Sequence, residues 1–223
     1  MRTIFRTLPL SLSGVILGIT LAAADYRVDW KVAVLLLLAV TFLHMYSVSS
    51  KEIQSDRLSG ISLALTIASG LAMLYFSFGT LLLMEPLILL VFGYMIIRAV
   101  RHTNFISRGK GIVYVFALFG LLGVMGSYYV CSHSFGGWPM IFPALSMGFL
   151  SVAAKADDDK TALRLALNVA GWAAMITYAC LRMFDPWHFL FMASLPVFFL
   201  KKPQWPPFAF AVLAGLGFLA FLL

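Results

Sequence analysis

Long apolar stretches, separated by short polar segments, follow one another along almost the whole chain. A helix needs about twenty mostly apolar residues to cross the hydrocarbon core of a bilayer, because each residue advances the helix by only about 1.5 Å. This pattern predicts an all-α integral membrane protein, a single transmembrane helical domain over residues 1–223. About nine spans are predicted, at residues 8–24, 32–49, 60–78, 80–99, 111–131, 137–154, 163–183, 187–200 and 205–222.

Three of these spans need interpretation. The third and fourth form one long apolar run, which we divide near Gly79 and at Met84–Pro86. The eighth is short, so it is expected to be tilted or to span only part of the bilayer. Arg2 and Arg6 precede an apolar run that ends at Leu21–Asp25, a pattern also typical of a signal peptide. Because further spans follow, we interpret it as a retained first helix.

Composition supports the membrane assignment. Hydrophobic residues make up 62% of the 223 residues, charged residues 11%, and the mean hydropathy is +0.96. A soluble domain of this size cannot hide so much apolar surface. The formal net charge is +7. Because the basic residues flank apolar runs, we expect lipid headgroups and an anionic substrate as partners, and no nucleic acid.

The distribution of lysine and arginine predicts the orientation of the chain. With a cytoplasmic N-terminus and nine spans, thirteen of the sixteen basic residues lie on the inner side. The three on the outer side are Arg27, Lys31 and Arg182. Such a bias is typical of a chain with its positive side inside. The inner loops after spans two, four and six then hold most of the charged residues and open on one face of the bundle.

Two of these inner loops carry carboxylates that suit a magnesium–diphosphate complex. Glu52 and Asp56 are four residues apart, so on a continuing helix both point to one side. The loop after span six holds Asp157–Asp159 beside Lys155 and Lys160. Magnesium prefers oxygen ligands and is commonly shared between carboxylates and substrate phosphates, and basic groups bind the remaining phosphate charge. The alternative is that these residues are solvated loop charges.

Weaker signals leave both a functional and a structural interpretation open. The segment Arg108–Gly111 leads into a span, where glycines and a helix N-terminus favour an anion, or it is a flexible basic boundary. His44 is interpreted as a hydrogen-bonded contact between helices, and Cys131 and Cys180 as buried thiols. Several aromatic residues either line a cavity for an isoprenoid or a carbocation, or pack between helices. They are Tyr46, Tyr114, Phe116, Phe119, Tyr128, Tyr129 and Trp172.

Three segments together resemble the UbiA superfamily of intramembrane prenyltransferases, most closely its dihydroxynaphthoate branch of menaquinone synthesis. Arg6–Trp30 resembles the opening Arg-x-x-Thr-Leu-Pro segment, and Gly109–Val130 the helix with a Gly-x-Tyr-Tyr pattern. Phe142–Leu167 resembles the second aspartate-rich loop and its Lys-x-Thr tail. The resemblance implies nine helices, an active site open to the cytoplasm, and the bacterial inner membrane.

The resemblance also implies site residues and a reaction. A polyprenyl group passes from a polyprenyl diphosphate to an aromatic, dihydroxynaphthoate-like acceptor, with Mg²⁺ as cofactor. Glu52 and Asp56 match the first aspartate motif, and Asp157–Asp159 match the second, contracted from Asp-x-x-x-Asp. The metal ligands implied are Glu52, Asp56, Asp157, Asp158 and Asp159, of which all but Asp158 are also the implied catalytic residues. The implied diphosphate-binding residues are Lys51, Lys110, Lys160 and Arg164.

Two other functions stay open. The contracted second motif is expected as well in a catalytically silent relative that binds lipid or quinone or acts as a membrane interaction partner. A small transporter is the third hypothesis, although transporters usually place ionisable residues at mid-membrane. Here Glu85 is the one acidic residue inside a long apolar run, and it adjoins Pro86 at a predicted hairpin.

Overall fold

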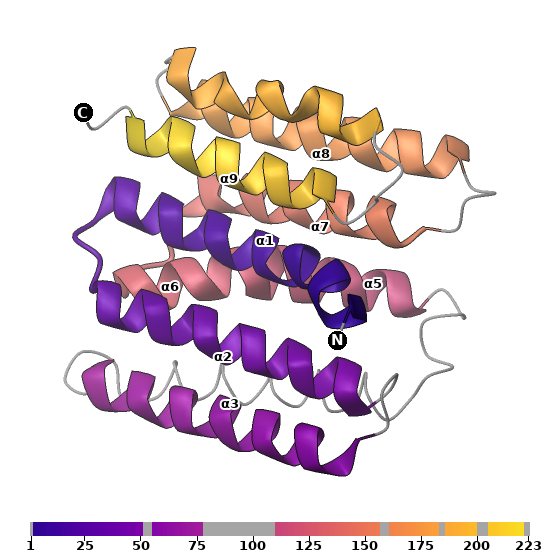
Figure 1. The fold of residues 1–223 in the computed structure, drawn as a ribbon. Coiled ribbons are helices and arrows are strands. Elements are labelled where there is room, and N and C mark those ends of the chain that lie inside the picture. Colours follow the sequence, from indigo (N-terminus) through magenta and orange to yellow (C-terminus); the bar gives the residue numbers. More distant parts are fainter. Residues whose placement is uncertain are drawn as a thin grey trace.

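The computed structural model describes residues 2–50, 55–77, 110–156, 161–182, 186–199 and 205–220 (Figure 1). These residues form helices and no strand, which confirms the all-α prediction for this part of the chain. The α-helices are α1 (Arg2–Asp25), α2 (Trp30–Val48), α3 (Asp56–Ser77), α5 (Lys110–Phe116), α6 (Ser127–Ser132), α7 (Ile141–Lys155), α8 (Thr161–Leu181) and α9 (Trp205–Ala220). A π-helix, η3 (Ala117–Gly126), joins α5 to α6, and two 3₁₀-helices are η4 (Trp138–Met140) and η5 (Pro186–Phe199).

Four helical stretches in the described part are long and apolar enough to cross a membrane. They are Thr7–Asp25, Trp30–Val48, Ile112–Ser132 and Thr161–Leu181, each close to a predicted span. Shorter apolar helices cover Trp187–Phe198 and Trp205–Ala220. The chain therefore has the character of a membrane protein. The predicted span at 80–99 lies outside the described residues.

Large apolar side chains cover the outer surface of the bundle, as expected where lipid is the solvent. On α3, Ile61, Ile67, Leu71 and Tyr75 are all more than half exposed. A soluble monomer rarely exposes so much contiguous apolar surface. The outward face of α3 is therefore suited to contact acyl chains.

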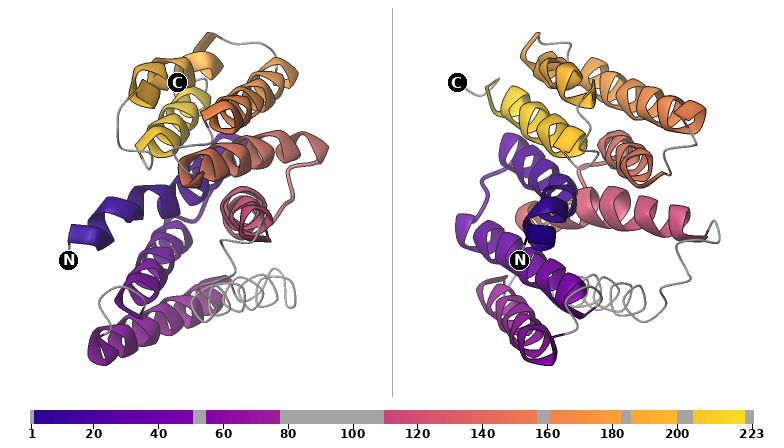
Figure 2. Two further views of the ribbon diagram at one scale, coloured as in Figure 1. Left: turned by 90° about the vertical axis from the view of Figure 1, so that its right-hand side faces the viewer. Right: turned by 45° about the vertical axis from the view of Figure 1, so that its right-hand side comes forward.

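Helix α1 lies in the middle of the bundle. It contacts α2, α6, η3, α7 and α9, whereas α3 packs on α2 and α8 packs on α7 (Figure 1). Leu10, Leu17 and Leu21 of α1 are almost completely buried for this reason. The helices α3 and α8 consequently stand on opposite sides of the bundle, as both views in Figure 2 show.

Glycines allow the backbone of α1 to approach the backbone of the π-helix closely. A Cβ atom added to Gly14 would overlap the carbonyl oxygen of Phe119, and one added to Gly18 would overlap that of Val124. Gly14 and Gly18 are four residues apart, so both lie on one face of α1. This is the small-xxx-small pattern by which membrane helices pack closely. Lipid tails are as apolar as the side chains of a neighbouring helix, so helix association depends on close van der Waals packing.

The π-helix η3 has ten residues, far longer than the single-turn bulges in which this geometry usually occurs. Its sequence contains Gly120, Gly123 and Gly126, all buried. A Cβ atom on Gly120 would overlap the backbone of Gly148 in α7 at 2.8 Å. The glycines thus let the wide helix fit between α1 and α7.

The winding of the eighth apolar segment makes it longer than an α-helix of the same number of residues. The 14 residues of η5 form a 3₁₀-helix, which rises about 2.0 Å per residue. Its length is therefore roughly 28 Å, against about 21 Å for an α-helix of the same number of residues. The longer figure is close to the hydrocarbon thickness of about 30 Å.

Aromatic packing fills the space between α8, η5 and α9. The Trp172 ring lies 5.3 Å from that of Phe191 and 5.2 Å from that of Phe210, measured between centroids. Phe191 and Phe210 are fully buried. Trp172, one of the aromatic residues considered above for a cavity, therefore packs between helices.

Candidate functional site

The described helix ends that flank the charged loops lie at one end of the bundle. There α2 and α7 end, and α3, α5 and α8 begin (Figure 1, right). We call it the Arg164 end, and the opposite end, where α1 and α8 finish, the Asp25 end. The helix directions agree with the prediction that the loops after spans two, four and six open on the same face.

Most of the predicted site residues lie outside the described residues. These are Lys51, Glu52, Asp157, Asp158, Asp159 and Lys160. Three predicted residues are placed. Asp56 begins α3 and is exposed, Lys110 begins α5, and Arg164 lies in the first turn of α8, half-buried.

The structure does not bring Asp56 and Arg164 together. Asp56 is on α3, which packs on α2, and Arg164 is on α8, which packs on α7. In Figures 1 and 2 these two helix pairs lie on opposite sides of α1. A ligand bound by both residues would have to extend across the Arg164 end.

The predicted magnesium site can be examined at one ligand. The Asp56 carboxylate is a hard oxygen donor at an exposed helix start, which is the type of group that Mg²⁺ prefers. Within the described ranges no three His, Cys, Asp or Glu side chains gather as a metal-binding group. Asp56 thus fits the metal chemically, and its predicted co-ligands are outside the described part.

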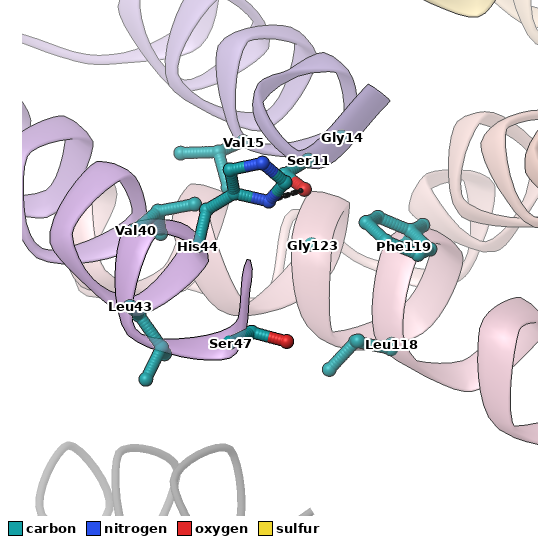
Figure 3. A pocket seen from close by; sticks show the side chains of 10 residues that line it. All are labelled: Ser11, Gly14, Val15, Val40, Leu43, His44, Ser47, Leu118, Phe119 and Gly123. Atoms are coloured by element: carbon teal, nitrogen blue, oxygen red, sulfur yellow. Dashed lines mark hydrogen bonds between the residues drawn. The ribbon is translucent and has the colours of Figure 1, made fainter. Parts of the chain in front are cut away.

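A pocket of about 110 Å³ lies between α1, α2 and the π-helix (Figure 3). Its lining residues His44 and Ser47 belong to the last two turns of α2, the helix that ends at the Arg164 end. Val15, Val40, Leu43, Leu118 and Phe119 give it apolar walls. The other lining residues are small or polar: Ser11, Gly14, His44, Ser47 and Gly123. A mostly apolar cavity with a few convergent polar groups is the usual form of a small-molecule site.

His44 crosses from α2 to α1 on one wall of this pocket. Its Nδ1 lies 2.8 Å from Ser11 Oγ, and its Nε2 lies 3.0 Å from Thr7 Oγ1. Both ring nitrogens are thereby satisfied by hydroxyls, which donate or accept according to the tautomer. This confirms the interpretation of His44 as a hydrogen-bonded contact between helices, and it also makes His44 part of the pocket.

Sequence reasoning missed Ser11, Ser47 and Gly123 as lining residues. Each is a small residue in an apolar helix, and such residues are common at helix–helix contacts in membranes. Among the lining residues, Phe119 alone belongs to the aromatic residues that the sequence offers for a cavity. The one available signal was His44, because ionisable side chains within spans usually face the bundle interior.

Comparison of the chain with protein-family models, with curated proteins and with solved structures finds no match. The resemblance carried by the motifs therefore remains a prediction.

Arg164 lines a second, much smaller pocket. It lies between α7, α8, η5 and α9 and holds about 30 Å³, enough for about one water molecule. Asn168 adds a second polar side chain, and Pro206 and Pro207 at the start of α9 close one wall. Arg164 and His44 therefore face separate cavities in the described structure.

Proposed function

We propose that this protein is an intramembrane prenyltransferase of the UbiA type. It transfers a polyprenyl group from a polyprenyl diphosphate to an aromatic or quinone-precursor acceptor. In this proposal the chain has nine spans in a bacterial inner membrane, with the N-terminus and the active-site face in the cytoplasm. The motifs that carry the resemblance are the first reason for it.

The observation that supports the proposal best is the position of the pocket beside His44. The pocket lies toward the Arg164 end, and its lining residue Ser47 is followed closely in sequence by Lys51 and Glu52. An apolar cavity in a membrane bundle excludes water, and exclusion of water protects a reactive intermediate from hydrolysis. Phe119 is one of the residues that line the pocket, and an aromatic ring attracts a cation placed over its face.

The proposed roles follow the charges. In this proposal Mg²⁺ would be held by the carboxylates of Glu52, Asp56, Asp157, Asp158 and Asp159, and it would supply positive charge next to the leaving diphosphate. Lys51, Lys110, Lys160 and Arg164 bind diphosphate oxygens. The pocket residues orient the acceptor and keep it dry.

A transfer assay tests the proposal. The purified full chain in lipid nanodiscs is given Mg²⁺, a labelled polyprenyl diphosphate and a panel of aromatic acceptors. We expect Mg²⁺-dependent transfer that falls at least about a hundredfold in Glu52→Ala and Asp157→Ala, since each removes charge stabilisation in the transition state. Asp29→Asn is the matched control, because Asp29 caps α2 at the Asp25 end and asparagine also caps helices.

The second candidate is a catalytically silent relative that binds lipid or quinone. The pocket volume of about 110 Å³ favours it, because substrate pockets usually exceed about 300 Å³ and a polyprenyl chain needs further room. No transfer to any acceptor in this assay, together with retained binding of lipid or quinone by the same protein, would reject the enzyme and support this alternative.

A further inference from the structure

Three exposed tryptophan side chains lie at the Asp25 end of the bundle (Figure 1, left). Trp30 begins α2, Trp138 lies in η4 just before α7, and Trp187 lies at the start of η5. Each of the three is more than half exposed. Tryptophan is enriched at the boundary between hydrocarbon and water, where its amphipathic ring sits among the lipid headgroups. The Asp25 end is therefore at the level of the headgroups of one leaflet.

The exposed charges at this end are mainly positive. Among the described residues there, Arg182 forms an ion pair with Asp25. Arg27, in the loop before α2, and Lys31, in the first turn of α2, are both exposed. The Asp29 carboxylate between them accepts the backbone N–H of Lys31 at 2.9 Å and thereby caps α2. Two exposed cations beside one carboxylate leave a net positive charge, which attracts anionic lipid.

Lys31 is held where the start of α2 meets the end of α3. Its ammonium nitrogen lies 5.5 Å from the centre of the Phe76 ring. The neighbouring Tyr75 ring packs edge-on against Phe76, with 5.5 Å between centroids, and is more than three-quarters exposed. An ammonium group has three N–H donors, and a cation–π contact needs only one side of it to face the ring. The exposed ammonium can therefore donate to a phosphate oxygen while it stays over Phe76.

An apolar surface for acyl chains continues from Lys31 along α2. Val34 and Leu38 follow Lys31 by three and seven residues, so all three side chains lie on one face of the helix. Both apolar side chains are more than two-fifths exposed. A phospholipid whose phosphate meets Lys31 would lay its chains along this face.

We propose that Lys31, supported by the charge of Arg27, binds the phosphate of an anionic phospholipid in the leaflet at the Asp25 end, with the lipid chains against Val34 and Leu38. In phosphatidylglycerol the phosphate charge is uncompensated, whereas phosphatidylcholine carries a cation of its own. The net positive charge of the site therefore selects the anionic lipid. This inference is independent of prenyl transfer.

Quenching by spin-labelled lipids tests the proposal on the full chain in nanodiscs. In a chain whose two cysteines are replaced by serine, Val34→Cys carries a bimane fluorophore one helical turn from Lys31. The nanodiscs contain equal amounts of phosphatidylglycerol and phosphatidylcholine, with the doxyl quencher attached to one lipid or to the other. We expect phosphatidylglycerol to be favoured about fivefold at this position, the gain that one basic residue near a membrane surface provides.

Three variants locate the site. Lys31→Gln is expected to lower the preference to less than about twofold, because the cation nearest the phosphate is lost. Lys31→Arg keeps the charge and should keep the preference. Arg57→Gln is the matched control, because it removes the same charge from an exposed position at the opposite end of the bundle and should leave the preference unchanged.

Several outcomes would overturn the site. They are equal quenching by the two lipids, a preference that Lys31→Gln leaves intact, and a preference that Arg57→Gln lowers as much as Lys31→Gln does. If Lys31→Gln does not fold, salt decides on the unaltered site. At about 1 M salt charges are screened within about 3 Å, so the preference should disappear; a preference unchanged by salt would reject the charge-based site. The assay contains no prenyl donor, so its result leaves the proposed function untouched.

Discussion

The Tyr128 hydroxyl donates a hydrogen bond of 2.6 Å to the carboxylate of Asp25, a residue 103 positions earlier in the chain. Asp25 ends α1, and its carboxylate also forms an ion pair with Arg182, the residue after α8. Burial lowers the pKa of the Arg182 guanidinium, which nevertheless remains cationic at neutral pH. One carboxylate therefore ties α1, α6 and α8 together at the Asp25 end.

Removing this carboxylate is expected to destabilise the bundle. Asp25→Ala leaves the partly buried guanidinium of Arg182 and the Tyr128 hydroxyl without their acceptor, which costs about 2 kcal/mol or more. Tyr128→Phe loses one hydrogen bond and costs about 1 kcal/mol. Reversible unfolding in mixed detergent micelles measures both. Arg27→Gln, an exposed change at the same end, is the control; equal stability of Asp25→Ala and this control would refute the role of the network.

Because α1 lies so close to the π-helix, we expect a single added methyl group at this contact to destabilise the protein. In Gly18→Ala the new Cβ meets the Val124 carbonyl and the Ser127 side chain, so the helices must separate. Overpacking of this kind costs about 1–3 kcal/mol. At Gly70 on α3 a Cβ atom meets nothing within 4 Å. Gly70→Ala should keep or raise the unfolding free energy in the same assay, because alanine favours helices. A neutral Gly18→Ala would contradict the packing.

His44 is expected to hold α1 and α2 together. Replacing it with leucine removes two hydrogen bonds, to Thr7 and Ser11, and costs about 1–2 kcal/mol. Glutamine keeps a donor and an acceptor, so His44→Gln should lose less. Thr177→Val removes a hydroxyl that bonds only its own helix and should change stability little. Unfolding free energies check the order, and His44→Leu as stable as Thr177→Val would exclude a bridging role.

The proposed orientation predicts which positions a membrane-impermeant maleimide reaches. Arg27 and Arg57 lie near opposite ends of the bundle. Arg27 is in the loop between α1 and α2, and Arg57 is at the start of α3. In a chain whose two cysteines are replaced by serine, Arg27→Cys should be labelled in cells with a permeable outer membrane. Arg57→Cys should be labelled only after the inner membrane is opened, because positive loops remain inside. Labelling of both from one side would disprove the proposed span count.

The pattern of the sequence predicts where the helices lie. The predicted spans at 8–24 and 32–49 match Thr7–Asp25 and Trp30–Val48 within two residues. In hydrocarbon every backbone N–H and C=O must be satisfied within the segment, so an apolar stretch of sufficient length has essentially one structure. Local composition is enough to identify it.

Helix winding was less accessible to sequence reasoning. Nothing in the apolar pattern distinguishes the π-helix of Ala117–Gly126 or the 3₁₀-helix of Pro186–Phe199 from an α-helix. The π-helix also makes close backbone contacts with a neighbouring helix, as at Gly120 and Gly148. Such contacts join residues distant in sequence, and hydrophobic periodicity does not encode them.

The sequence by itself determined that the chain is helical, that its helices suit a bilayer, and that its charged residues gather in particular loops. These properties follow from the length, apolarity and flanking charge of each segment taken alone. Only the tertiary structure decided that His44 meets Ser11, that Asp25 meets Tyr128 and Arg182, and that Asp56 and Arg164 stand apart. Which helix faces which depends on the fit of small side chains across the interface, because lipid solvates apolar surfaces as well as a neighbouring helix does.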